Sequence, residues 1–355
     1  MLALLGSLLG FTGVVGLVGW VTSTPGHTGP GMPHFDGRKF HNLEPTRRAP
    51  SEVMRGIATW TRGAWNLGPV PAAERPPERV QNGIRVTMVG HATVLVQMDG
   101  VNLLTDPVWS VAAGPRGWMG PRRRRPPALP LDALPPIDLV LLSHNHYDHL
   151  DVPTLVALHQ KHRCTVVTPL GNAAYLRRFG IDAVELDWWG SSLQRGLAVT
   201  CVPAQHFSGR GLFDRDHSLW GGFVVEGPAG RVYFAGDTGW GSHFAEIGER
   251  CGPPDVALLP IGAFRPRAIM RPVHTDPEEA VRAHRALGAV RSVPIHFGTF
   301  ALGADGPDEA LTGLAAARVQ HGVAEEAFAE LAHGASLVVR VIDRECDPAR
   351  SSLPS

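Results

Sequence analysis

One short run of metal-ligand residues constrains this chain more than any other feature of its sequence. Residues 138–143 (DLVLLS) form a short apolar run, which is typical of a strand buried on both faces. His144, His146, Asp148 and His149 follow it directly. A rigid strand end can hold several side chains around one point, and imidazole with carboxylate suits zinc, or less selectively iron and manganese. The run therefore predicts a metal centre.

The surrounding sequence predicts strands interleaved with helices. Strands are expected at residues 84–89, 93–98, 101–105, 138–143, 197–202, 222–226, 232–235, 256–260 and 292–296. Helices are expected near residues 51–65, 153–161, 172–179, 276–287 and 308–321. This alternation is typical of an α/β fold, and 355 residues leave room for one large domain or two ordinary ones.

The N-terminal segment, residues 1–22, is almost wholly apolar, and the first 35 residues contain no Lys, Arg, Asp or Glu. About 20 apolar residues suffice to cross a bilayer, which favours a retained membrane anchor. A cleaved signal segment is the alternative, although it would usually begin with a positive charge. No positive side chain precedes this segment, and Arg38, Lys39, Arg47 and Arg48 follow it, which leaves the orientation ambiguous by the positive-inside rule; counting these charges would place the catalytic domain in the cytoplasm. We expect association with a bacterial inner membrane, with the side of the membrane left open.

Charge and cysteine content exclude some partners. The chain has 33 basic and 33 acidic residues, so no global field draws it to nucleic acid, and we expect no nucleic-acid partner. The four cysteines lie far apart without a CxxC pair. They form no zinc-finger pattern and do not establish a disulfide framework.

Three further ligand-type residues follow predicted strands. His206 comes after residues 197–202, Asp237 ends the strand at 232–235, and His296 ends the strand at 292–296. An α/β sheet places its ligand crevice at strand ends, so these residues are candidates for the same centre. A lone histidine after a strand is more often structural, so the residues alone leave this open.

An HxHxDH run after a buried strand resembles the signature of the metallo-β-lactamase superfamily. Other segments resemble its branch of phospholipases D that hydrolyse N-acylphosphatidylethanolamine. They are residues 89–93 (VGHAT), 104–107 (LTDP), 136–138 (PID), 144–151 (HNHYDHLD), 203–206 (PAQH), 236–239 (GDTG), 276–280 (DPEEA) and 295–300 (IHFGTF). The resemblance covers about residues 60–340. It implies an αββα four-layer sandwich of two mixed sheets flanked by helices, at residues 81–345. Residues 23–80 would form an extended arm packed on this domain, and residues 346–355 a tail.

The resemblance also implies a ligand set for two metal ions, taken to be zinc. The first ion would be held by His144, His146 and His206, the second by Asp148, His149 and His296, with Asp237 bridging the two.

Asp148 and His274 are the candidate catalytic residues. His274 lies outside the ligand set and precedes Asp276, Pro277 and Glu279, which together predict a capped helix start. The resemblance makes His274 a group that supports the ligands or faces the substrate, where it would steady a phosphate or protonate a leaving group. A surface histidine beside a helix start is the alternative. His91, between two paired strands, is interpreted as structural.

The branch hydrolyses phospholipids to N-acylethanolamine and phosphatidic acid, and the resemblance implies this activity. Residues 122–125 are four arginines, Arg122, Arg123, Arg124 and Arg125, which would either meet anionic headgroups at a membrane surface or form a solvated loop. Residues 207–210 (FSGR) depart from the mammalian-type pattern after PAQH, which puts acyl-chain preference in doubt. Hydrolysis of lactones, other small esters or phosphodiesters is the alternative function. A non-enzymatic envelope protein is the third, and a homodimer is left open.

Overall fold

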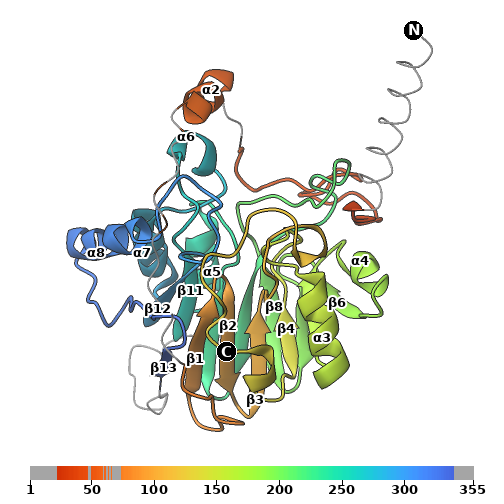
Figure 1. Ribbon diagram of the computed structural model, residues 1–355, viewed down its shortest axis with the longest axis vertical. Helices are drawn as coiled ribbons and strands as arrows, with labels where there is room; N and C mark the ends of the chain where they lie inside the picture. Colours follow the sequence, from red (N-terminus) through yellow and green to blue (C-terminus); the bar gives the residue numbers. More distant parts are fainter. Residues whose placement is uncertain are drawn as a thin grey trace.

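The computed structural model describes residues 22–46, 49–58, 60, 63, 65 and 73–339. Two β-sheets lie face to face, with helices on their outer sides (Figure 1). Of the predicted N-terminal segment only Thr22 is described, and residues 346–355 lie outside the described part. Within that part, no helix has both the length and the apolar character needed to span a membrane.

The first sheet has seven strands in the order β13-β1-β2-β3-β4-β5-β6. They are β1 (Ile84–Gly90), β2 (Thr93–Met98), β3 (Val101–Thr105), β4 (Leu139–Leu141), β5 (Thr165–Pro169), β6 (Ala183–Leu186) and β13 (Ser336–Val339). Strands β13, β1, β2 and β3 pair antiparallel, whereas β3 to β6 run parallel, so the sheet is mixed.

The second sheet has six strands in the order β12-β11-β10-β9-β8-β7. They are β7 (Ser191–Gln194), β8 (Leu197–Val202), β9 (Gly222–Gly227), β10 (Gly230–Phe234), β11 (Val256–Pro260) and β12 (Arg291–Ile295). The pairing is antiparallel from β7 to β10 and parallel from β10 to β12.

The core follows from the alternation of side chains along each strand. On β2, Val94, Val96 and Met98 point into the main core, where they join residues of the second sheet such as Phe223. Leu95 points the other way, into a separate apolar cluster that also contains residues of helices α3 and α4. At β2 the first sheet is therefore buried on both faces.

Helices complete the outer layers. On the first sheet lie α3 (Val152–His162) and α4 (Ala173–Arg177), and on the second lie α5 (His243–Cys251) and α7 (Pro277–Leu287) with α8 (Glu309–His321) packed against α7. Two short helices, α2 (Pro50–Ala58) and α6 (Arg267–Met270), contact each other at the top of the view in Figure 1. Short 3₁₀ turns occur at Pro115–Gly117 and Leu131–Ala133. The predicted αββα sandwich is confirmed.

All nine predicted strands are present, with ends shifted by up to two residues. The helix expected near residues 51–65 is shorter and ends at Ala58. Strands β5, β6, β7 and β13 and helices α5 and α6 were not predicted. β13 was missed because its edge position shows only through its pairing with β1, some 250 residues away.

Part of the N-terminal arm contacts the loop that follows β8. The backbone N–H and hydroxyl of Thr24 donate to Asp214 Oδ2 at 2.8 and 3.0 Å. Asn42 exchanges two hydrogen bonds with the backbone of His206, at 2.7 and 2.9 Å. These contacts tie the arm directly to a predicted ligand.

Candidate metal centre

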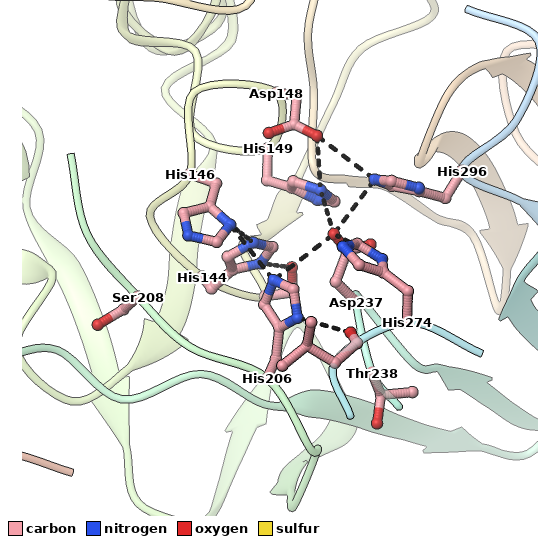
Figure 2. A network of polar contacts seen from close by, with 12 residues as sticks. His144, His146, Asp148, His149, His206, Ser208, Asp237, Thr238, His274 and His296 are labelled. Carbon is pink, nitrogen blue, oxygen red and sulfur yellow. Dashed lines mark hydrogen bonds and ion pairs between the residues drawn. The ribbon is translucent and has the colours of Figure 1, made fainter. Parts of the chain in front are cut away.

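The predicted ligands lie together where strands of both sheets end (Figure 2). The run His144–His149 follows β4 of the first sheet, and His206, Asp237 and His296 follow β8, β10 and β12 of the second. Gly236 permits this approach: its φ is +61°, and a Cβ there would lie 2.5 Å from the Cβ of Ser143. The ligands therefore meet only because the two sheets face each other.

A first group of donor atoms consists of three imidazole nitrogens. His146 Nδ1 lies 2.8 Å from His144 Nε2 and 3.3 Å from His206 Nε2. Zinc–nitrogen bonds of about 2.0–2.1 Å place tetrahedral ligand atoms about 3.3–3.4 Å from one another. The 3.3 Å separation matches this spacing and the 2.8 Å separation is shorter than it, so the three nitrogens converge on one point.

A second group consists of two carboxylate oxygens and two imidazole nitrogens. His149 Nε2 lies 3.2 Å from Oδ2 of both Asp148 and Asp237, and His296 Nε2 lies 3.3 and 3.1 Å from the same two atoms. His149 Nε2 is buried and makes no hydrogen bond despite this proximity. Four donors at nearly equal spacing, one of them without a hydrogen bond, fit a metal better than a hydrogen-bond network.

Asp237 lies between the two groups. Besides its contacts with the second group, its Oδ2 lies 3.7 Å from His206 Nε2 of the first. Its Oδ1 is buried and has no hydrogen-bond partner in the described structure. This carboxylate therefore lies within 4 Å of nitrogens of both groups, where the resemblance implies a shared ligand, and that role stays a prediction.

Three of the five predicted ligand imidazoles are held from behind through their other ring nitrogens, whereas His296 Nδ1 is buried without a hydrogen-bond partner in the described structure. His149 Nδ1 lies 2.6 Å from Asp106 Oδ2, and His206 Nδ1 lies 2.8 Å from the carbonyl oxygen of Val273. His144 Nδ1 lies 2.9 Å from the hydroxyl of Ser143. Such partners fix the tautomer that leaves the facing nitrogen free to bind a metal.

Comparison with known proteins agrees with this geometry. The β-lactamase superfamily domain matches residues 101–297, more than half of the chain. The chain belongs to the metallo-β-lactamase superfamily. An uncharacterized protein of Mycobacterium tuberculosis is 42% identical over 284 residues, which are 76% of this chain and 75% of the relative.

A second relative within the superfamily is the N-acyl-phosphatidylethanolamine-hydrolyzing phospholipase D 1 of Caenorhabditis elegans. It is 43% identical over 237 residues, 63% of this chain and 66% of the relative. Among solved structures, a possible metal-dependent hydrolase of Veillonella parvula has a TM-score of 0.59 at 17% identity and covers 72% of this chain and 100% of its own. This last likeness concerns the fold alone.

The charges of the site favour a bound cation. Burial lowers the pKa of His206 to about 3 and that of His146 to about 4, so both imidazoles are neutral at pH 7. For Asp148 and Asp237, burial raises the pKa, but the charge of His149 and the hydrogen bonds outweigh it and hold the pKa well below the usual range. Burial also lowers the pKa of His296, yet Asp237 and Asp148 outweigh it and raise it to about 9. The two carboxylates thus attract positive charge, which a proton or a metal ion can supply.

A cavity of about 250 Å³ opens onto the donors. Its polar lining consists of His146, Asp148, Arg215, Asp237, His274 and His296. Its apolar lining consists of Phe207, Ala263, Ile269, Met270, Val273 and Leu302. A substrate in this cavity would meet both donor groups and an apolar wall.

His274 lies at this cavity, and the capped helix start predicted next to it is present. Asp276 and Glu279 form the reciprocal capping box, with Pro277 in the first turn of α7. His274 Nδ1 lies 3.9 Å from Asp237 Oδ2 and is buried without a hydrogen bond in the described structure. Its position suits a group that faces the substrate, and that role stays a prediction.

The four predicted substrate-binding arginines do not line the cavity. Arg123 is half-buried, donates to the carbonyl oxygens of Ser110 and Val108, and lies over the ring of Phe300. Arg125 contacts His333 at 3.3 Å. Arg122 and Arg124 have exposed side chains. Contact with lipid headgroups stays a prediction, and the structure gives Arg123 and Arg125 partners within the fold.

Two residues of the site were not among the predicted ligands. Asp106 directly follows β3 and is fully buried against His149. Its position after a predicted strand could have marked it as a residue of the site, because Asp237 was assigned from the same kind of position. His91 follows β1, and its Nε2 lies 3.0 Å from Asp148 Oδ2. His91 was interpreted as a structural residue of the sheet, and its ring in fact contacts the predicted ligand Asp148.

Proposed function

We propose that this protein is a dinuclear zinc phosphodiesterase that cleaves N-acylphosphatidylethanolamine-type phospholipids to N-acylethanolamine and phosphatidic acid. The observation that carries the proposal is the pair of adjoining donor groups that share Asp237 at the bottom of a cavity with an apolar wall. The relative from Caenorhabditis elegans, named for this activity, supports the choice of substrate.

The seven ligands fit two zinc ions by number, type and spacing. His144, His146 and His206 would bind one ion, and Asp148, His149 and His296 the other, with Asp237 shared. When bound, such a pair supplies Lewis acidity and lowers the pKa of water so that a nucleophile is available at neutral pH. The chain's own residues then have to orient the substrate and handle protons.

His274 is the residue placed for proton handling. Its Nδ1 is without a hydrogen bond and its side chain lines the cavity beside Asp237. The carbonyl oxygen of His274 accepts from Arg267 at 2.9 Å, and Thr275 N–H donates to Thr238 at 2.8 Å, so the backbone around it is fixed. A substrate oxygen would be the natural partner of this imidazole.

The apolar wall suits a lipid. Ile269 and Met270 of α6 line the cavity, and α6 packs on α2, where Gly56 lies against Ile269. On α2, Met54 and Ile57 are 66% and 58% exposed. We propose that this apolar surface, together with residues 1–22, brings the cavity to a membrane surface.

The test is a comparison of substrates with the purified full-length chain loaded with zinc. Vesicles of N-acylphosphatidylethanolamine should yield N-acylethanolamine and phosphatidic acid by mass spectrometry, and Asp237→Asn should abolish both products. Metal analysis should give about two zinc ions per chain. The cavity volume of about 250 Å³ lies below the usual range for ligand pockets of about 300–1,000 Å³, which favours small esters as the second candidate. Strong hydrolysis of a water-soluble lactone without any lipid product would support that candidate, and a metal ratio near one would end the dinuclear proposal.

A further inference from the structure

A single arginine lies at the mouth of the metal cavity. Arg215 belongs to the loop between β8 and β9, which also carries His206, and among the described residues that line the cavity it is the only arginine or lysine. It also lines a second cavity of about 130 Å³, whose other walls include His41, Asn42 and Trp220. Arg215 thus stands where the metal cavity adjoins a polar one.

The Arg215 side chain is supported by its neighbours yet open to a ligand. Its guanidinium lies 4.3 Å from the centre of the Phe207 ring, a cation–π contact, and Phe207 packs in turn against His146 and His206. Its Nε lies 3.5 Å from Asp216 Oδ2. The terminal nitrogens form no hydrogen bond within the described structure, and the side chain is 60% exposed. A planar donor pair is therefore held at the cavity without a partner.

The charges of the cavity give this arginine a role in substrate choice. Two buried carboxylates, Asp148 and Asp237, line the cavity, and their negative charges would neutralise much of the charge of bound metal. A phosphodiester carries a full negative charge that a neutral ester or lactone lacks. The guanidinium matches phosphate oxygens with two parallel N–H donors, whereas a neutral carbonyl gains little from it.

We propose that Arg215 is a substrate-binding residue that receives the non-bridging oxygens of the substrate phosphate and so selects anionic phosphodiesters over neutral esters. The proposal rests on the phosphodiesterase function proposed above. It assigns the substrate phosphate to the boundary between the two cavities, and an acyl chain of the substrate to the apolar wall that includes Ile269 and Met270.

The test compares Arg215→Gln, Arg215→Lys and a control, Arg195→Gln, in the zinc-loaded full chain. Arg195 is exposed in the turn between β7 and β8 and lines neither cavity. Bis(p-nitrophenyl) phosphate serves as the anionic substrate and p-nitrophenyl acetate as the neutral one. For Arg215→Gln we expect kcat/KM on the phosphodiester to fall about 10- to 100-fold, mostly through KM, because a charge-assisted hydrogen bond is lost. Activity on the ester should stay within about twofold, Arg215→Lys should recover part of the loss, and Arg195→Gln should behave as wild type.

Inorganic phosphate provides a readout that does not depend on turnover. Calorimetric titration should show weaker phosphate binding to Arg215→Gln by a similar factor, with unchanged zinc content. Equal losses on both substrates, or phosphate binding unchanged by the substitution, would overturn the role of Arg215. If wild type hydrolyses no phosphodiester, the proposed function fails by itself, while the phosphate titration still decides whether Arg215 binds the anion.

Discussion

We expect Asp106 to determine which nitrogen of His149 carries the proton, and Asp106→Asn tests this. The carboxylate is fully buried and accepts from the N–H of Ser143 at 2.7 Å, the Ser143 hydroxyl at 2.5 Å and His149 Nδ1 at 2.6 Å. If the asparagine oxygen keeps the Ser143 N–H, its NH₂ group faces His149 Nδ1. The imidazole is then pushed toward the tautomer with hydrogen on Nε2, which cannot bind metal.

The size of the effect follows from the contact that is lost. A hydrogen bond to a charged group contributes about 1.5–3 kcal/mol, and partners behind a ligand typically change metal affinity about 10- to 100-fold. We therefore expect zinc affinity at the group formed by Asp148, His149, Asp237 and His296 to fall about 10- to 100-fold. The other group, centred on His146, should be affected much less.

Chelator competition, with bound zinc quantified by mass spectrometry, measures this change as a shift of one of the two binding steps. Asp138→Asn is the matched control, because Asp138 is also a structural carboxylate next to β4 but pairs with Arg79 and the N–H of Asn102. It should lower the melting temperature and leave zinc affinity unchanged. The reasoning is refuted if Asp106→Asn binds zinc within twofold of wild type, or if Asp138→Asn loses zinc equally.

Two further substitutions test how the site is supported and reached. Arg210 donates to the carbonyl oxygens of Asn145 and Leu150 at 2.7 and 2.8 Å and lies over the ring of Tyr147. Arg210→Met should therefore lower the free energy of unfolding, measured by denaturant titration, by about 2 kcal/mol or more, and Arg210→Lys should lower it by less. Equal stability of wild type and both variants would contradict this role. Ile57→Asp on α2 should reduce turnover of vesicle substrate several-fold and leave turnover of bis(p-nitrophenyl) phosphate unchanged, because it removes exposed apolar surface outside the cavity. Parallel losses on both substrates would argue against a membrane contact at α2.

The positions of the predicted ligands could be assigned because each follows a strand and strands were visible as apolar runs, whereas the ligand set itself came from the resemblance to the superfamily. His206, Asp237 and His296 could be assigned to strand ends without knowing how the sheets pack. The supporting residues were harder to predict. Asp106 was noted only within residues 104–107, a segment of the resemblance, and the position of His91 between paired strands suggested a role in the sheet, whereas its ring contacts Asp148.

The arginines show a second limit of local reasoning. A run such as Arg122–Arg125 suggests a charged surface, yet Arg123 lies over Phe300 and has its hydrogen-bonding groups occupied by backbone carbonyls. Arg215 stands alone in the sequence and lies at the cavity. Whether an arginine faces solvent, the core or a ligand depends on where its loop packs, and local composition carries no information about that.

The centre itself depends on contacts that are distant along the chain. The first sheet contributes the ligands after β4 and the supporting residues after β1 and β3, while the second contributes His206, Asp237 and His296. Neither sheet alone carries a complete ligand set for the second donor group, since Asp148 and His149 come from one and Asp237 and His296 from the other. A metal ion at that group would therefore join the two sheets as well as prepare the reaction. Metal binding at this group would in turn require that the two sheets are packed together. The donor residues can therefore be predicted from the strands they follow, whereas their convergence on one point depends on how the sheets pack.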